Sequence, residues 1–248
     1  RCHWVILILV FPIMGVGLYL LIGLNGGTLK MRERYAQIDR ELLPLLPNDS
    51  ECRETLGRKI PKAGNIADYI QRNASYPVYQ NTDVIYYDEA VKGLEAQLED
   101  LAKAEKFIFM EYHAIEDAQA WHKIQSVLED RVKAGVDVRV FYDDMGSIGF
   151  INTDFIKKME KVGIHCRVFN PLYSRGLNVF LNNRDHRKIT VIDGKVGFTG
   201  GYNLANEYFN FTHPYGQWKD TGIRLEGEAV HSLTVTFLEM WNAVSDKE

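Results

Sequence analysis

Two residues in the C-terminal half of the chain, His186 and Lys188, have the types and spacing that phosphate-ester chemistry needs. In a strand, residues two positions apart share a face, so the imidazole and the ammonium group should point the same way. Near neutral pH an imidazole can act as a nucleophile or as a general acid or base. A lysine ammonium supplies a fixed positive charge for phosphoryl oxygens. The pair therefore predicts phosphoryl transfer that needs no metal ion and no other cofactor.

The residues that follow this pair predict a β-hairpin with a phosphate-binding end. Asp193 and Gly194 lie between two apolar runs, which is a strong hairpin signal. Gly201, the second of two adjacent glycines, lets the backbone approach a ligand closely. Asn203 offers an amide donor to phosphate oxygens. We expect Lys188, Gly201 and Asn203 to bind the substrate phosphate, while Asp193 suits a tight turn in its own right.

Strands and helices alternate around this segment. Hydrophobic periodicity predicts strands at residues 83–87, 107–112, 136–142 and 163–169, and helices at residues 88–104, 119–134, 154–162 and 227–244. Elements of these lengths in alternation are typical of an α/β layer fold with a mostly parallel or mixed sheet. The sequence therefore predicts a mixed sheet flanked by helices over residues 81–248.

Several further side chains are candidates for supporting this site. Glu111 stands at the end of a predicted strand, where ligands often gather in α/β sheets, and Glu207 lies in a loop after the hairpin. Asp143 and Asp144 could form a metal pair, but we favour a loop or substrate-side role for them. Large apolar side chains in the loop before His186 could meet lipid or pack in the core: Tyr173, Leu177 and Phe180.

Composition narrows the class of ligand and the compartment. The 248 residues carry a formal net charge of −4, with 46% hydrophobic and 25% charged residues, as in ordinary globular proteins. No clustered basic excess is present, so nucleic acid is not an expected ligand. The three cysteines, Cys2, Cys52 and Cys166, are scattered and form no C-x-x-C motif. A disulfide framework or a zinc site is therefore not expected, and a reducing compartment is.

The N-terminal region predicts a membrane anchor. Residues 4–24 hold no charged side chain, and 21 helical residues would span about 32 Å, enough for a bilayer core. Lys30, Arg32 and Arg34 follow, which favours a cytoplasmic catalytic body. A signal peptide or a buried core helix would explain the run less well. We expect a transmembrane helix at residues 1–29, a juxtamembrane segment and linker at residues 30–80, and the catalytic domain after it.

The pattern H-x-K-x4-D, followed by x6-G-G-x-N, resembles the HKD motif of the phospholipase D superfamily. The matching residues are His186, Lys188, Asp193, Gly200, Gly201 and Asn203. The strings EYH at 111–113, YDDMGS at 142–147 and WKDT at 218–221 are similar in order and spacing to those of bacterial cardiolipin synthases. The resemblance covers nearly the whole chain and implies a phospholipase-D-like fold.

This resemblance implies an activity and a set of catalytic residues. Enzymes of that family join two phosphatidylglycerol molecules into cardiolipin and release glycerol through a phosphatidyl-histidine intermediate. A second histidine protonates the leaving alcohol. His186, Lys188 and Asp193 are then catalytic, with Asp193 assisting the histidines, and the protein works at the bacterial cell membrane on membrane lipids.

The chain departs from the family pattern because it holds one HKD motif where two are usual. We expect an N-terminal fragment whose second HKD half normally lies in the same chain. Two alternatives remain open: a membrane-anchored phosphodiesterase or nuclease with a single HKD motif that completes its site as a homodimer, and an inert membrane scaffold that kept the fold.

Overall fold

The computed structural model describes residues 2–20, 29–152, 154–171 and 184–244. Its centre is a mixed seven-stranded sheet in the order β1-β7-β6-β5-β2-β3-β4. The strands are β1 (Thr82–Tyr87), β2 (Phe107–Tyr112), β3 (Asp137–Asp143), β4 (His165–Phe169), β5 (Lys188–Ile192), β6 (Val196–Gly200) and β7 (Gly222–Gly227). Pairing is parallel from β2 through β3 to β4 and antiparallel elsewhere. The predicted α/β fold with a mixed sheet is confirmed.

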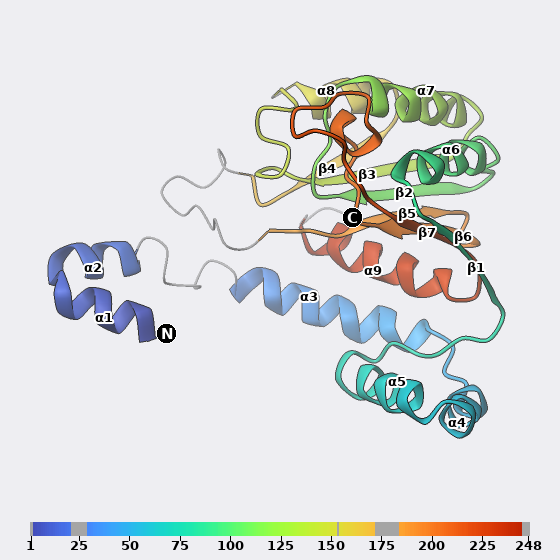
Figure 1. Ribbon diagram of the computed structural model, residues 1–248, viewed down its shortest axis with the longest axis horizontal. Helices are drawn as coiled ribbons and strands as arrows, with labels where there is room; N and C mark the ends of the chain where they lie inside the picture. The colour runs from blue at the N-terminus through green and yellow to red at the C-terminus, as the bar shows by residue number, and fades with distance from the viewer. Residues whose placement is uncertain (1, 21–28, 153, 172–183, 245–248) are drawn as a thin grey trace.

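Helices cover both faces of this sheet (Figure 1). The helices on one face are α6 (Ala90–Leu101), α7 (Gln119–Lys133) and α8 (Phe155–Lys161), together with the short 3₁₀ helix η4 (Asn206–Phe209). The other face carries α9 (Val230–Ala243), which in turn packs against α3 (Leu29–Leu42). The strand β5 that follows His186 therefore lies in the middle of a three-layer body.

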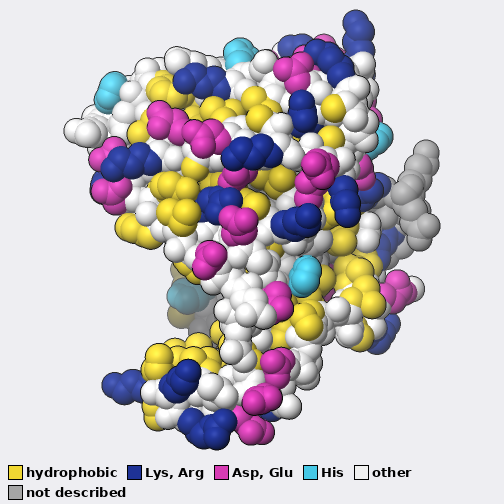
Figure 2. Space-filling model, turned by 90° about the vertical axis from the view of Figure 1, so that its right-hand side faces the viewer, with side chains coloured by type: hydrophobic (Ala, Val, Ile, Leu, Met, Phe, Trp, Pro, Cys, Tyr) yellow, Lys and Arg dark blue, Asp and Glu magenta, His cyan; other side chains and the backbone are white. Residues whose placement is uncertain are grey.

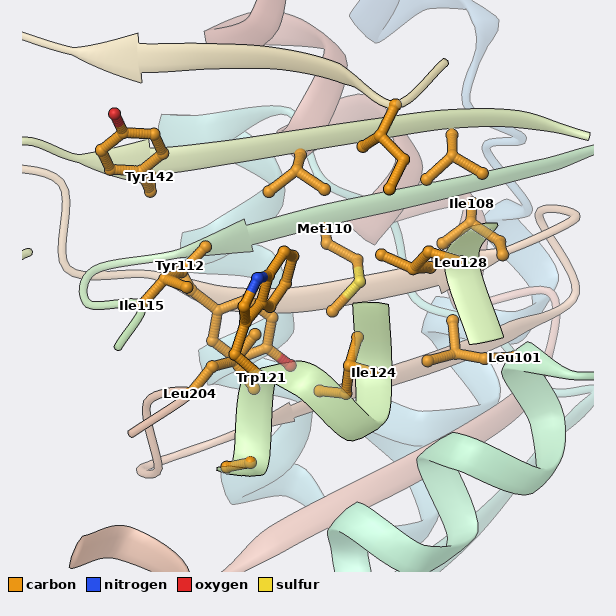
Figure 3. Packing of buried hydrophobic residues seen from close by; sticks show 14 of the residues in the cluster. Leu101, Ile108, Met110, Tyr112, Ile115, Trp121, Ile124, Leu128, Tyr142 and Leu204 are labelled. Carbon is orange, nitrogen blue, oxygen red and sulfur yellow. The ribbon is translucent and has the colours of Figure 1, made fainter. Parts of the chain in front are cut away.

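The face under α7 holds the larger apolar core (Figure 3). Trp121, Ile124 and Leu128 recur at helical spacing on α7 and are fully buried. They meet Ile108 and Met110, which alternate on β2 and point to the same side. A smaller core on the opposite face includes a Phe109–Phe237 ring pair with centroids 4.7 Å apart. Because apolar side chains pack on both faces of β2, the position of this strand in the sheet is fixed.

The predicted transmembrane helix at residues 1–29 is not supported. The apolar run forms two short helices, α1 (Cys2–Val10) and α2 (Pro12–Leu18), and residues 21–28 lie outside the described residues. Proline lacks an N–H and its ring clashes with the preceding turn, so Pro12 begins a second helix and does not continue the first. The two helices pack closely against each other, since a Cβ at Gly15 would lie only 2.7 Å from the Ile8 Cα. Across the described residues we find no helix with the length and apolar character needed to cross a bilayer.

Residues 30–80, predicted as a juxtamembrane segment and linker, are largely helical. After α3 and the 3₁₀ turn η3 (Leu43–Leu45) come α4 (Ser50–Lys59) and α5 (Pro61–Ala74), which pack against each other. The Asp49 carboxylate caps α4 by accepting the backbone N–H groups of Glu51 and Cys52. Tyr35 of α3 donates a hydrogen bond of 2.7 Å to Glu239 of α9. The segment that precedes the sheet is therefore fastened to it.

The surface mixes charges of both signs. On the face shown in Figure 2, Lys and Arg side chains are interspersed with Asp and Glu side chains, and no single basic patch covers the sheet domain. At the edge of the sheet, β1 exposes Val84, Ile85 and Tyr86. This strand has one hydrogen-bonded neighbour, β7, among the described strands.

Candidate active site

The candidate site lies at one end of the sheet, where β2 and β3 finish and β5 begins. Antiparallel pairing sets Tyr112, the last residue of β2, beside Lys188, the first residue of β5. Asp143 ends β3 at the same edge. His186 stands two residues before β5 and its side chain is exposed. The three central strands thus bring the HKD histidine and lysine to the end of β2 and β3.

The His186 and Lys188 side chains are in direct contact. Lys188 Nζ lies 3.1 Å from His186 Nδ1 and donates a hydrogen bond of 2.9 Å to the His186 carbonyl oxygen. An ammonium group can only donate, so Nδ1 accepts in this arrangement and the neutral ring carries its proton on Nε2. Lys188 is buried, whereas His186 faces solvent. The structure therefore brings together the two residues that the sequence singled out.

The surroundings of His186 favour an uncharged imidazole, although the Asp185 and Asp143 carboxylates act in the opposite direction. Partial burial, the neighbouring Lys188 ammonium and His113 lower the pKa of His186 below its ordinary value. Burial also lowers the pKa of Lys188, while Asp185 and Asp220 act in the opposite direction. A neutral imidazole beside a cation is the form that can attack phosphorus.

Asp143 organises the backbone that leads to His186. Its Oδ1 accepts from the Gly146 N–H at 2.9 Å and from Arg184 Nη1 at 3.2 Å, and its Oδ2 accepts from the Asp185 N–H at 2.9 Å. The carboxylate is fully buried. Its oxygens are engaged by the protein, so Asp143 acts as a loop anchor. Within the described ranges, no three His, Cys, Asp or Glu side chains gather as a metal site would require.

The structure does not bring Asp193 to the other predicted catalytic residues. It follows the last residue of β5, so the whole strand separates it from His186. Its carboxylate accepts from the backbone N–H groups of Glu105, Lys106 and Phe107 at 2.7–2.9 Å. Asp193 has a φ of 54°, a turn conformation that Asp tolerates. In this position it fixes the start of β2 to the hairpin turn.

The two residues predicted with Lys188 to bind phosphate lie near the site but have partners within the protein. A Cβ at Gly201 would lie 2.1 Å from Asp220 Oδ1, so the glycine makes room for that carboxylate. Asn203 is buried; its Oδ1 accepts from the Ala114 N–H at 3.1 Å and its Nδ2 donates to the Tyr208 hydroxyl at 2.8 Å. Asn203 thus joins the hairpin to the segment after β2.

Glu111 and Glu207, the two candidates for supporting the site, lie in β2 and in the 3₁₀ helix η4. Glu111 is fully buried on the opposite face of the sheet from Lys188, and burial raises its pKa well above the ordinary value. Arg187 Nη2 lies 2.7 Å from Glu111 Oε1, an ion contact without hydrogen-bond alignment. Glu207 lies in η4, where burial and the Glu207 charge raise the pKa of Tyr208, the partner of Asn203.

Three residues near the HKD pair were given no role by sequence reasoning. They are His113, Asp185 and Asp220, whose side chain or charge reaches His186 or Lys188. Two of them stand in strings that marked the family resemblance, but a string does not say which side chains meet. Tyr173, Leu177 and Phe180, for which lipid contact and core packing were both left open, lie outside the described residues.

Comparison with known proteins extends over most of the chain. Residues 98–241 match the family model described as cardiolipin synthase, PLD-like domain. An uncharacterized protein of Streptococcus mutans is 39% identical over 242 residues, which are 98% of this chain and 52% of that protein. The major cardiolipin synthase of Bacillus subtilis is 31% identical over 250 residues, 98% of this chain and 51% of that enzyme.

Among solved structures, the phospholipase D family member Nuc from Salmonella typhimurium aligns with a TM-score of 0.49 at 17% identity, over 66% of this chain and 95% of Nuc. The chain spans about half the length of the curated relatives it matches.

Proposed function

The chain belongs to the cardiolipin synthase family of phospholipase-D-like domains, and we propose that it supplies the first catalytic half of a phosphatidyltransferase. This enzyme joins two phosphatidylglycerol molecules into cardiolipin and releases glycerol. The contact between His186 Nδ1 and Lys188 Nζ carries the proposal, because it places a neutral nucleophile beside a cation that can hold a phosphodiester.

In the first step, a ring nitrogen of His186 attacks the phosphorus of one phosphatidylglycerol. A phosphorus–nitrogen bond forms, and the bond to the terminal glycerol oxygen breaks. The leaving glycerol takes a proton from the histidine of a second HKD half. Lys188 turns from Nδ1 to the phosphoryl oxygens and offsets their negative charge. Once that contact is released, the ring proton can move to Nδ1 and leave the Nε2 lone pair for attack.

In the second step, a glycerol hydroxyl of another phosphatidylglycerol attacks the phosphatidyl-histidine. The hydroxyl gives its proton to the second histidine, the phosphorus–nitrogen bond breaks, and cardiolipin leaves with His186 restored. The number of ester bonds is unchanged, so the reaction needs no external energy source. Both substrates are lipids, so we propose that the protein acts at the bacterial cell membrane with its catalytic body on the cytoplasmic side.

The second half of the site is proposed to come from a further HKD domain in the same polypeptide. This fits a chain that holds one HKD motif and spans about half the length of its curated relatives. In this arrangement Asn203 and Gly201 position the hairpin around Lys188, and Lys188 makes the direct contact with the phosphate. Glu111 supports the strand end from the opposite face of the sheet.

Product analysis with labelled phosphatidylglycerol tests the proposal. Bacterial membranes that carry the natural full-length protein should form labelled cardiolipin and glycerol, whereas the 248-residue chain alone should not. His186→Ala should abolish the product. His165→Ala should not, because His165 is an exposed residue at the opposite end of the sheet. If the 248-residue chain cleaves phosphodiesters or nucleic acid as a dimer and the full-length protein makes no cardiolipin, the single-motif alternative replaces the synthase.

A further inference from the structure

His113, the residue after β2, makes a second histidine contact inside this half of the site. Its ring lies against the ring of His186, with centroids 4.5 Å apart and planes inclined by 47°. Its Nδ1 lies 2.6 Å from the carbonyl oxygen of Asp185, the residue directly before His186. A carbonyl only accepts, so His113 Nδ1 donates this hydrogen bond. One side chain therefore holds both the ring of His186 and the backbone next to it.

The backbone of the loop after β3 confines His113 from another side. A Cβ at Gly146 would lie 2.6 Å from His113 Cε1 and 2.2 Å from the His113 carbonyl oxygen. Gly146 is itself fixed, because its N–H donates to the buried Asp143 carboxylate. That carboxylate also binds the Asp185 N–H. His113 and His186 are thus held to each other through the same loop anchor.

We propose that His113 is a positioning residue for His186: it fixes the orientation of the His186 ring and opposes its protonation. This inference rests on the proposed function of His186 as the nucleophile. Two imidazoles in contact do not both take a proton easily, so a proton on one ring disfavours a proton on the other. The arrangement would keep His186 in the neutral form while its ring faces the substrate side.

Other charged groups act on the same pair and do not vary in the variants described below. Those that face His186 are Lys188 from β5, Asp185 from the segment before β5, and Asp143 from the end of β3. Arg184 is bound to Asp143, and Asp220 acts on Lys188. Glu111 from β2 points to the opposite face, toward Arg187. Replacing His113 alone therefore isolates its contribution.

Two substitutions separate the functions of the ring. His113→Asn keeps an amide donor near the position of Nδ1 and removes the ring, whereas His113→Phe keeps a ring and removes the nitrogen atoms that can donate or take up a proton. His165→Gln is the matched control, since it removes a histidine from the opposite end of the sheet. All variants are made in the natural full-length protein in membranes. The rate at which diethyl pyrocarbonate modifies His186 is followed against pH by peptide mass spectrometry.

Both His113 variants should move the titration of His186 to higher pH, because the neighbouring imidazole that lowers the pKa of His186 is gone. The kcat for cardiolipin formation should fall by about tenfold to a hundredfold, with KM little changed, as expected when a reacting group is misaligned. The acid limb of the pH–rate profile should follow the titration. His165→Gln should leave all three quantities unchanged.

An unmoved His186 titration in both variants would overturn the proposal, even if kcat falls, because His113 would then act through packing alone. Should His113→Asn fail to fold, the ring-preserving Phe variant decides. A full-length protein that never forms cardiolipin would reject the proposed function instead. The modification of His186 still measures the effect of His113 in that case, so the two failures are distinguishable.

Discussion

Asp143 Oδ2 accepts a hydrogen bond of 2.9 Å from the backbone N–H of Asp185, which ties the end of β3 to the residue directly before His186. The same carboxylate also holds Arg184 and the Gly146 N–H. A single buried side chain therefore determines where the segment that carries the HKD histidine enters the sheet.

Replacing the Asp143 carboxylate should lower both the unfolding free energy of the protein and the activity of the site. In Asp143→Asn one acceptor oxygen becomes a donor, and Arg184 loses its charged partner. We expect a loss of about 1–3 kcal/mol in unfolding free energy, the usual cost of leaving a buried polar group unpaired. Cardiolipin formation should fall at least tenfold, since the positioning of His186 is lost. Urea unfolding and product analysis measure the two effects.

The exposed Asp154 offers a control for this experiment. Its carboxylate makes a surface ion pair with Lys157, and such pairs contribute little to stability. Asp154→Asn should therefore leave both measurements near those of the unmodified protein. Equal behaviour of the two variants would mean that Asp143 does not anchor the HKD segment.

Gly201→Ala should move the Asp220 carboxylate away from the site. The added Cβ would lie 2.1 Å from Asp220 Oδ1, and Asp220 is one of the two carboxylates that support the charge of Lys188. We expect a fall in kcat on the order of a hundredfold, as for other misplacements of a reacting group by about 1 Å. Gly57→Ala is the control, because a Cβ there meets nothing within 4 Å. Comparable activity of the two variants would count against a role for Asp220.

Asp193→Asn should lower stability and spare catalysis. The change removes one of three hydrogen bonds to the backbone before β2, so we expect a loss of about 1 kcal/mol in unfolding free energy at neutral pH. The kcat of the folded protein should stay within about twofold, because β5 separates Asp193 from His186. A folded but inactive Asp193→Asn protein would restore the catalytic role that the HKD resemblance implies.

The pH dependence of this stability difference has a definite sign. Burial alone would raise the pKa of Asp193, but the backbone hydrogen bonds and Lys195 outweigh it, and the folded pKa is lowered from 3.8. A lowered carboxylate pKa gives stability that is present above the unfolded pKa and is lost as pH falls through the folded pKa. The unfolding free energies of the two proteins should therefore converge below about pH 4. A difference that grows in acid would contradict this assignment.

Arg187 and Glu111 should behave as a coupled pair. Arg187→Met leaves the buried Glu111 without its cationic neighbour, and Glu111→Gln leaves Arg187 short of negative charge. Breaking a buried ion pair from one side typically costs about 3–5 kcal/mol. The double variant should cost less than the sum of the single variants. Strict additivity in urea unfolding would show that the 2.7 Å contact contributes no coupling.

The sequence predicted the central strands well because their apolar runs are unambiguous. The strand expected at residues 107–112 has the observed bounds of β2, where apolar side chains point into cores on both faces. β7 was not predicted, since only Ile223 and Leu225 alternate there with charged neighbours. The helices α4 and α5 were also missed, because their polar sequence resembles a linker until they pack together.

The candidate site divides in the same way. His186 and Lys188 were found because strand geometry alone puts residues two apart on one face. Asp220 and His113 could not be assigned, since their contacts depend on how β2, β5 and the segment before β7 come together in the sheet. The family resemblance placed Asp193 in the site. The tight turn predicted at Asp193 and Gly194 describes where Asp193 lies in the structure.

The pairing of β1 with β7 has a consequence for how the chain is made. The two strands are neighbours in the sheet, yet β7 lies about 140 residues later in the chain. At a synthesis rate of about 5–20 residues per second, β1 waits roughly 7–28 seconds for its partner. During that time Val84, Ile85 and Tyr86 stand on an unpaired strand, which is a template for mispairing with other chains. Productive folding therefore requires that β1 does not pair with another chain before β7 has been synthesised.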